Sequence, residues 1–224
     1  MTAADGFLVL DKPAGVSSAK ALNDVKRRFG RGVKVGHAGT LDPFATGCLV
    51  VLVGRATKSS ERVMTLPKTY VADVRCGATT ETLDPESPEE PGPSIAEPSR
   101  AKIEALLSAA AGPMMQKPPA FSAIKVGGRR SYDLARGGQD VDLPAREVQV
   151  HAMRLVEMDW PRVRVEMTVG KGFYVRSFAR DFAEMLGTTG YLTSLRRTRV
   201  GPFNADRATG VDGELMPIRL LDGP

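Results

Sequence analysis

An uninterrupted apolar run over residues 48–53 follows directly on a loop rich in glycine. A run of this length, bounded by turn residues, predicts a strand in the centre of a sheet. The preceding residues 36–47 hold three glycines, Pro43 and one of the chain's two histidines, His37. Asp42 is the only carboxylate in that loop, and Pro43 disfavours a helical conformation for it. The pattern predicts a rigid loop that presents one carboxylate beside one imidazole, backed by a buried strand.

Strand patterns outnumber helix patterns along the rest of the chain. Strands are expected over residues 7–10, 34–37, 49–53, 70–76, 122–126, 148–158, 162–169 and 192–200. Helices are expected between Ser17 and Gly30 and over residues 56–64, 100–111, 132–136 and 175–186. Strands that dominate, with helices at irregular intervals, predict an α+β fold with a mixed, mainly antiparallel central sheet and flanking helices.

The charge distribution points to a polyanionic partner. The net charge is +5, yet residues 81–99 contain six acids, five prolines and no basic residue. Without those six acids the rest of the chain carries +11, an excess that favours binding to nucleic acid. The acidic segment, residues 84–98, is expected to be a solvated loop because it is too polar to bury.

The two cysteines and the chain's N-terminus indicate a cytoplasmic setting. Cys48 and Cys76 lie in apolar, strand-like runs and are expected to be buried free thiols. Neither has a second cysteine or a histidine at a zinc-binding spacing, so no metal site is expected. The first residues do not have the pattern of a signal peptide, and no stretch approaches 18 consecutive apolar residues. We therefore expect no membrane span.

Asp42 is the candidate nucleophile, because a carboxylate can attack carbon and later leave. An attacking carboxylate must be ionised, which a nearby cation favours. Arg176 is the candidate cation, since it lies near the start of an amphipathic helix with Val175 and Phe178 beside it. Two alternatives stay open at this point: residues 36–47 can form an ordinary turn, and Arg176 can extend its charged end into solvent.

Several motifs, in order along the chain, resemble those of the TruB family of tRNA pseudouridine synthases. They read DKPAGVSS at residues 11–18, GHAGTLDPFATG at 36–47, KTY at 68–70, QKPPAFSAIK at 116–125, GKGFYVRSFARDFAEMLG at 170–187 and LTSLRRTRVG at 192–201. Ser17, Phe121, Gly170 and Phe173 depart from the residues usual in the family. The resemblance implies the pseudouridine synthase fold and an isomerase that converts uridine 55 in the T loop of tRNA to pseudouridine. It implies no cofactor and no metal.

The resemblance also implies a role for each site residue. Asp42 would be the nucleophile and Arg176 its partner, while Tyr70 would stack on the flipped uracil and act in proton transfer. The alternative for Tyr70 is an ordinary half-buried strand tyrosine. Residues expected to bind the substrate are His37, Tyr174, Leu195, Lys12 and Lys68. His37 would fill the space that the flipped base leaves, and its alternative is a purely structural hydrogen bond. Lys12 would also support the active-site loop.

The same resemblance sets the expected domain organisation and partners. Residues 1–224 are expected to form one catalytic domain, with an insertion at about 115–147 that grips the T arm of tRNA. Many bacterial members continue into a C-terminal RNA-binding PUA domain, which is not expected here. The chain is expected to be a monomer without an obligatory protein partner. Two alternatives remain: a tRNA chaperone with minor catalysis, and a synthase acting on another RNA. Whether Asp42 attacks C1′ or C6, or promotes loss of a C2′ proton, stays open.

Overall fold

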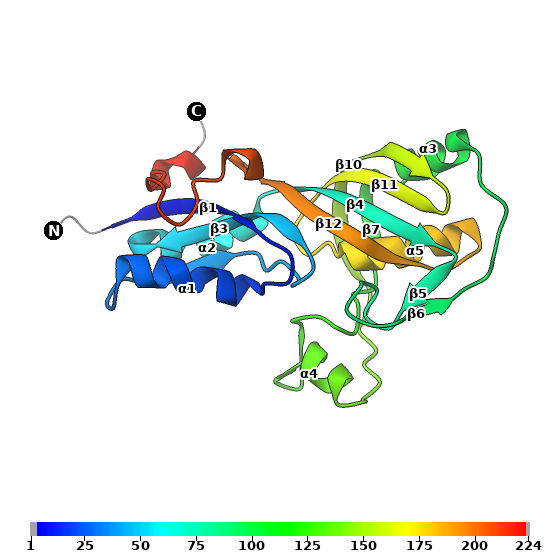
Figure 1. Ribbon diagram of the computed structural model, residues 1–224, viewed down its shortest axis with the longest axis horizontal. Coiled ribbons are helices and arrows are strands. Elements are labelled where there is room, and N and C mark those ends of the chain that lie inside the picture. The colour runs from blue at the N-terminus through cyan, green and yellow to red at the C-terminus, as the bar shows by residue number, and fades with distance from the viewer. Residues whose placement is uncertain (1–3, 223–224) are drawn as a thin grey trace. The chain divides into compact units, whose positions relative to one another are not determined.

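A computed structural model describes residues 4–222, and Figure 1 shows its course. The chain divides into two compact units, each described here by itself. The first unit combines residues 1–71 with residues 195–224, and the second unit is residues 72–194. The expectation of one catalytic domain over the whole chain stays a prediction.

The first unit is built around the predicted buried strand. Its strands are β1 (Gly6–Lys12), β2 (Val35–Ala38), β3 (Thr46–Val53), β13 (Phe203–Asn204), the start of β4 (Lys68–Cys76) and the end of β12 (Gly190–Val200). Its helices are α1 (Ser18–Phe29) and α2 (Ser60–Thr65), with three 3₁₀ turns, η1 (Gly54–Ser59), η2 (Ala205–Arg207) and η3 (Ile218–Leu221). Within this unit the strand order is β1-β3-β12, and β2 pairs with β3 as well.

Strand β3 is central because it has partners along both edges. One edge pairs with β1 antiparallel over its whole length, from Gly6 opposite Val53 to Lys12 opposite Gly47. The other edge pairs with β12, parallel, near its start and with β2, antiparallel, near its end. Residues 48–53 are at most 1% exposed, so the prediction of a buried central strand is confirmed.

The two faces of this sheet carry two separate hydrophobic clusters. Leu8 of β1 and Val51 of β3 pack with Leu22 and Val25 of α1, which covers that face. On the other face, the cluster consists of Phe7, Val9, Ala38, Cys48, Val50, Leu52, Ala56, Val63, Val200, Phe203 and Ala205. Because successive strand residues point to opposite faces, an all-apolar strand is the expected sequence where both faces are covered.

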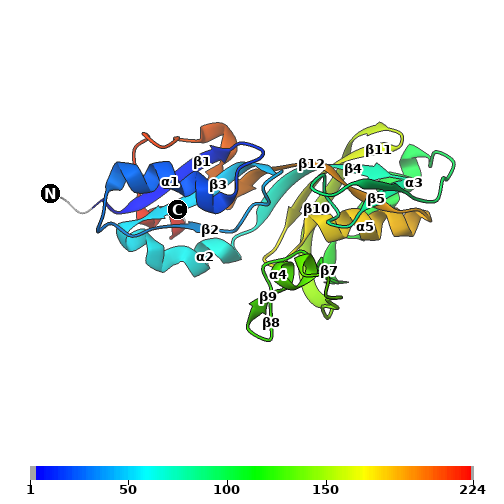
Figure 2. The same cartoon turned by 60° about the horizontal axis from the view of Figure 1, so that its bottom comes forward.

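The second unit contains a larger antiparallel array. Its elements are the end of β4, β5 (Ala78–Thr80), β6 (Glu89–Pro91), α3 (Arg100–Ala109), β7 (Gly112–Gln116), β8 (Lys125–Val126), β9 (Arg129–Arg130), α4 (Ser131–Arg136), β10 (Arg146–Asp159), β11 (Arg162–Val169), α5 (Val175–Leu186) and the start of β12. The strand order is β12-β4-β11-β10-β7. In Figure 2, α4 and the β8–β9 hairpin project from the ends of β7 and β10, in the segment expected to be an insertion.

Three local expectations need correction. The strand expected over residues 122–126 is limited to β8, Lys125–Val126. Residues 56–64 do not form one helix, because the 3₁₀ turn η1 runs to Ser59 before α2 begins. The acidic segment is not solvated throughout: Asp84 is 2% exposed, and β6 pairs with β5. The Asp84 carboxylate has partners nearby in the sequence, since it accepts hydrogen bonds from the Thr82 hydroxyl at 2.6 Å and the Glu86 amide at 3.0 Å. A polar residue can be buried where such partners are supplied.

Cys48 and Cys76 are buried free thiols, as predicted. Burial raises the pKa of Cys48 to about 11 and that of Cys76 to about 12, so both stay protonated and unreactive near neutral pH. Over residues 4–222, no helix is long and apolar enough to cross a membrane.

Candidate active site

The loop between β2 and β3 presents Asp42, which is half-buried in the first unit. The Ala45 amide donates to the Asp42 carbonyl at 3.1 Å, which closes a tight turn after Pro43. Gly47 ends the loop at φ +101°, and a Cβ there would lie 2.2 Å from the Arg197 carbonyl oxygen. Only glycine fits that approach, so this glycine of the motif is explained by close backbone packing.

Both neighbours of Asp42 are held in place by the protein. The Ser18 hydroxyl accepts a hydrogen bond from the Leu41 amide at 2.9 Å and donates to the Leu41 carbonyl at 3.0 Å. The Pro43 carbonyl accepts from the Gly15 amide at 2.8 Å and from Lys12 Nζ at 3.1 Å. The backbone on either side of Asp42 is therefore fixed by groups from the segment that links β1 to α1.

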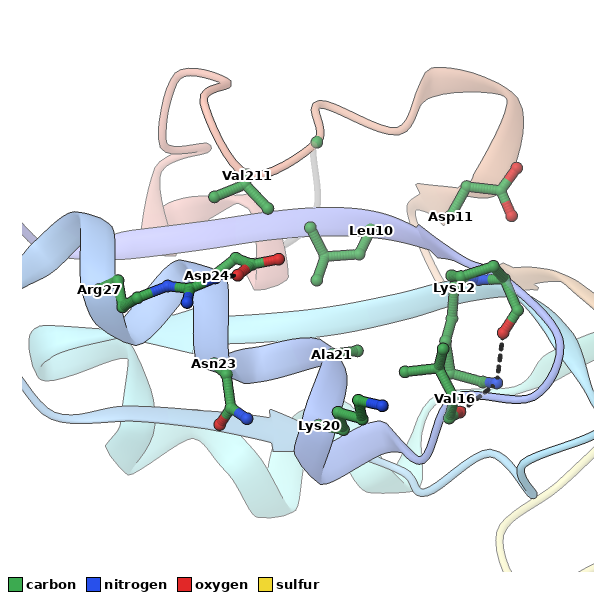
Figure 3. A pocket seen from close by; sticks show the side chains of 12 residues that line it. Leu10, Asp11, Lys12, Val16, Lys20, Ala21, Asn23, Asp24, Arg27 and Val211 are labelled. Carbon is green, nitrogen blue, oxygen red and sulfur yellow. Dashed lines mark hydrogen bonds and ion pairs between the residues drawn. The ribbon is translucent and has the colours of Figure 1, made fainter.

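Lys12 is 1% exposed and its ammonium faces the protein. Besides Pro43, Nζ donates to the carbonyls of Val16 at 2.7 Å and Pro13 at 2.8 Å, two bonds that Figure 3 shows. The ammonium thus links three backbone carbonyls, one of which directly follows Asp42. The geometry supports the loop-supporting role expected for Lys12.

The first unit has a cavity of about 570 Å³ between α1, β1 and the segment around Val211. Figure 3 shows the side chains that line it. Lys12 is the one predicted site residue that lines it. Its other walls include the exposed ion pair of Asp24 and Arg27 and the apolar side chains of Leu10 and Val211. The cavity therefore lies beside the segment that supports the Asp42 loop and does not contain Asp42 itself.

His37 lies on β2 and is half-buried. Burial, followed by the positive charges of Arg197 and Lys26, lowers the pKa of the imidazole below its usual 6.5. The ring is therefore neutral at pH 7. Its Nδ1 is buried and has no hydrogen-bond partner within residues 4–222. A neutral imidazole with an unsatisfied nitrogen suits a hydrogen bond to a ligand better than it suits packing.

Lys68 and Tyr70 both lie at the start of β4. Lys68 is 7% exposed, and its ammonium donates to the carbonyls of Leu66 at 2.7 Å and Met64 at 2.5 Å. These carbonyls belong to the C-terminal end of α2, where a cation is favourable. Tyr70 is half-buried on the same strand. Leu195, expected to pack near the substrate base, is 6% exposed on β12.

Arg176 lies in the first turn of α5 in the second unit and is 6% exposed. Its Nη1 donates to the Thr82 carbonyl at 2.9 Å, and its Nη2 donates to the Phe121 carbonyl at 2.8 Å. Nη1 also lies 3.4 Å from Oδ2 of Asp84, which makes a buried ion pair. The alternative of a solvated Arg176 is therefore wrong, because these partners hold the guanidinium inside the protein.

Asp84 is a residue that the sequence reasoning missed. It lies at the start of the segment that we expected to be a solvated loop, and its proximity to Arg176 spans 92 positions, from 84 to 176. Leu83 beside it has φ +61°, an uncommon value for a branched residue. The one available signal is local: Thr82 and Asp84 have the spacing of a side-chain turn, which can shield a carboxylate.

Tyr174 caps the start of α5 through its backbone. Its amide donates to Gln116 Oε1 at 2.8 Å, and its carbonyl accepts from Gln116 Nε2 at 3.1 Å. Gln116 is 1% exposed, so this two-bond contact anchors the turn before α5 to the end of β7. The second unit thus brings Tyr174 and Arg176 together with Gln116 and Asp84. The first unit gathers Asp42, His37 and Lys12 around β3.

No group of three or more histidine, cysteine, aspartate or glutamate side chains among the described residues could hold a metal ion. The first unit offers the Asp42 carboxylate, on a loop whose backbone is held on either side, and the neutral imidazole of His37 on the strand before it. The second unit offers a buried guanidinium beside a tyrosine. These groups suit covalent attack by a carboxylate and contacts to a flat, polar ring.

Comparison with known proteins identifies the family of this chain. A family model described as TruB family pseudouridylate synthase (N terminal domain) matches residues 26–175. The protein named tRNA pseudouridine synthase B of Caulobacter vibrioides is 45% identical over 211 residues, which are 94% of this chain and 67% of that protein. The protein of the same name from Cereibacter sphaeroides is 47% identical over 210 residues, 93% of this chain and 69% of that protein.

Solved structures agree on the fold. A chain from the crystal structure of a Cbf5-Nop10-Gar1 complex superposes with a TM-score of 0.68 at 27% sequence identity. The match covers 89% of this chain and 50% of that chain. This chain thus spans about two thirds of the curated relatives and half of that structural neighbour.

The family model and the curated relatives define the class: the chain is a pseudouridylate synthase, built on a mixed, mainly antiparallel sheet with Asp42 on the loop before β3. The chain belongs to the TruB family of pseudouridylate synthases, as its motifs predicted. The α+β fold with a central sheet and flanking helices is likewise confirmed.

Proposed function

We propose that this chain converts uridine 55 in the T loop of tRNA to pseudouridine, with Asp42 as the nucleophile. The observation that carries the proposal is the backbone fixation of Asp42 through Leu41 and Pro43, within the motif that matches the family. A carboxylate fixed in this way needs little reorganisation before it attacks. The relatives named tRNA pseudouridine synthase B, at about 45% identity, support tRNA as the substrate.

The reaction is an isomerisation in which one bond to the sugar replaces another. The bond between N1 of uracil and C1′ breaks, the uracil turns, and a bond between C5 and C1′ forms. C5 then loses its proton to a base and N1 gains one, so atoms and charges balance. The target nucleotide must leave the stack of the T loop, since the reacting atoms are otherwise inaccessible. Whether Asp42 first attacks C1′, attacks C6 or promotes loss of a C2′ proton stays open.

The remaining site residues are assigned to binding and proton transfer. Tyr70 offers its ring to the flipped uracil and its phenol to the proton at C5. The neutral imidazole of His37, with its unsatisfied Nδ1, is suited to contact the RNA. Tyr174 and Leu195 line the nucleotide. Lys12 and Lys68 act through the backbone, because their ammonium groups donate to protein carbonyls.

Arg176 is assigned as the cation that keeps the nucleophile ionised. Its position is fixed in the second unit by the carbonyls of Thr82 and Phe121 and by the carboxylate of Asp84. An arginine suits this task because its planar guanidinium can serve several acceptors at once and remains charged at any working pH. Asp84 is a positioning residue for it.

The insertion at about 115–147 is assigned to the T arm. Its hairpin β8–β9 exposes Lys125 and carries Arg129, both suited to phosphate contacts. Arg136 stacks over the ring of Tyr132 at 4.4 Å, which stiffens α4. We further propose a monomer that acts in the cytoplasm, where tRNA is processed, without an obligatory protein partner.

Single-turnover assays of the lone chain on a T-arm stem-loop test these assignments. The wild-type chain should form pseudouridine, and Asp42→Asn should lose activity by more than about 1,000-fold, on the order expected for loss of a nucleophile. The asparagine variant should still bind the stem-loop with wild-type affinity. Product formation by Asp42→Asn at the wild-type rate would overturn the nucleophile assignment.

The two alternatives make different predictions in the same assay. If the chain is a chaperone with minor catalysis, the wild-type chain and the Asp42→Asn variant should refold tRNA equally well. A synthase for another RNA would give no product on the stem-loop. The alternative of a synthase for another RNA is retained because of the 27% identity to a chain from a Cbf5-Nop10-Gar1 complex. The higher identity to the tRNA enzymes favours tRNA.

A further inference from the structure

Two side chains outside the expected catalytic set hold the Asp42 loop. Ser18, the first residue of α1, is 2% exposed and forms two hydrogen bonds with the backbone of Leu41. Arg197, on β12, is 1% exposed and lies at the two ends of the loop. Its Nη2 donates to the Gly39 carbonyl at 3.0 Å, and its Nε donates to the Cys48 carbonyl at 2.8 Å.

Arg197 holds the two ends of the loop, and Ser18 holds its middle. One guanidinium bridges the Gly39 carbonyl before Asp42 and the Cys48 carbonyl after it. The Ser18 hydroxyl satisfies both the amide and the carbonyl of the residue directly before Asp42. Helix α1 packs on the sheet and β12 is one of its strands, so both side chains hold the loop from regular elements of the fold.

The burial of Arg197 argues against a role in stability alone. No carboxylate within residues 4–222 forms an ion pair with it, so the charge is buried against carbonyl dipoles only. Burying a charge without a counter-ion costs free energy. An apolar residue at the same position of β12 would avoid that cost. A lysine would carry the same charge, yet it lacks the separate Nε and Nη2 donors that the planar guanidinium directs at the Cys48 and Gly39 carbonyls.

We propose that Ser18 and Arg197 are positioning residues, which preorganise the Asp42 loop for attack on the nucleotide. The inference rests on the proposed function of Asp42. A displacement of about 1 Å in a reacting group can cost on the order of 100-fold in rate. Loosening the loop should therefore slow the chemical step while the surfaces that bind RNA stay intact.

The test compares Ser18→Ala and Arg197→Lys with wild type in single-turnover pseudouridine formation and in stem-loop binding, well below each variant's melting temperature. Each variant is expected to lose about 10- to 100-fold in the single-turnover rate. The dissociation constant for the stem-loop is expected to stay within about twofold, since neither side chain faces solvent. A role in folding alone would lower the melting temperature without changing the rate of the folded fraction.

Two control variants separate loop order from stability. Ser17→Ala removes the hydroxyl that caps α1 through the Lys20 amide, one residue from Ser18. Val200→Ala opens a cavity in the core on the same strand as Arg197. Both controls should lower the melting temperature and leave the single-turnover rate unchanged.

The outcomes distinguish this inference from the proposed function. If Asp42→Asn is inactive while Ser18→Ala and Arg197→Lys both keep the wild-type rate, the positioning role is wrong and the nucleophile assignment stands. If Asp42→Asn is active, the proposed function itself is wrong. Should Arg197→Lys fail to fold, Ser18→Ala against Ser17→Ala decides alone, because both remove one hydroxyl from the same turn.

Discussion

Arg176 Nη1 lies 3.4 Å from Asp84 Oδ2, and both side chains are buried, at 6% and 2% exposure. A carboxylate of the protein therefore balances the charge of the buried arginine. Its two carbonyl partners, Thr82 and Phe121, lie on separate segments of the second unit. The guanidinium is thus an ordered group whose direction is set by the fold.

Asp84→Asn should weaken the site through Arg176. The amide keeps the shape of the carboxylate but removes the negative charge, so the buried guanidinium loses its ion pair with Asp84. We expect a loss of about 3 kcal/mol in the free energy of unfolding and a fall of about 10-fold or more in the single-turnover rate. Denaturant unfolding and rapid-quench assays measure the two effects.

The control for this variant is Glu90→Gln, which removes one exposed acidic charge from β6 in the same segment. It should match wild type in both measurements. Equal behaviour of Asp84→Asn and Glu90→Gln would show that the ion pair with Arg176 has no part in the reaction.

Gly47→Ala should be far more disruptive than Gly30→Ala. Both glycines have positive φ, at +101° and +74°, so alanine is strained at either position. A Cβ added at Gly30 would meet open space, whereas at Gly47 that atom would overlap the Arg197 carbonyl. We expect about 1 kcal/mol for Gly30→Ala from backbone strain and at least twice that for Gly47→Ala.

Denaturant unfolding of both alanine variants checks the comparison. Equal losses at the two positions would mean that β12 moves away from β3 at no cost, contrary to the close approach of the two strands at Gly47. Activity gives a second measure, because Gly47 ends the Asp42 loop and Gly30 lies at the far end of α1.

His37 should make the fold less stable in mild acid. Its pKa is lowered from 6.5 in the folded chain, mainly by burial, so the unfolded chain binds a proton first as the pH falls. The contribution of His37 is therefore complete above pH 6.5 and is lost as the pH falls below 6.5 towards the folded-state pKa. Below both values it no longer changes.

Melting temperatures of wild type and His37→Gln, each in a His151→Gln background, test this sign. The glutamine variant should lose less stability between about pH 7.5 and pH 5.5, a range that brackets the ordinary pKa of histidine, than the protein that keeps His37. Proton NMR of the remaining imidazole gives its pKa directly. A value above 6.5 would contradict the burial argument.

Gln116→Met should destabilise the start of α5. Methionine has nearly the same volume but cannot form the two hydrogen bonds that Gln116 makes with the backbone of Tyr174. The Tyr174 carbonyl keeps the bond from the Phe178 amide, and the Tyr174 amide loses its bond to the Gln116 side chain. We expect a loss of about 1–3 kcal/mol in the free energy of unfolding. Ser99→Ala, which removes only the cap of α3, is the control and should cost about 1 kcal/mol. If Gln116→Met loses no more stability than Ser99→Ala, solvent replaces both hydrogen bonds of Gln116.

Local patterns were sufficient to predict much of this protein. The apolar run before Gly54, the amphipathic helix closed by Gly187 and the alternation in β11 all correspond to elements with nearly the expected bounds. Each of these signals arises from neighbours within one turn of helix or a few strand residues. The Asp42 loop was likewise visible as a motif, and family membership followed from the order of such motifs.

The tertiary structure alone decided how the functional groups are held. The bonds from Ser18 to Leu41 span 23 residues, and the bond from Arg197 to Gly39 spans 158. No periodicity links residues so far apart, because their contact depends on how whole strands and helices pack. For the same reason an aspartate in an acidic, proline-rich segment was expected in solvent and lies buried against Arg176. The sequence by itself thus determined the motifs and the family, and packing determined which side chains of those motifs are fixed.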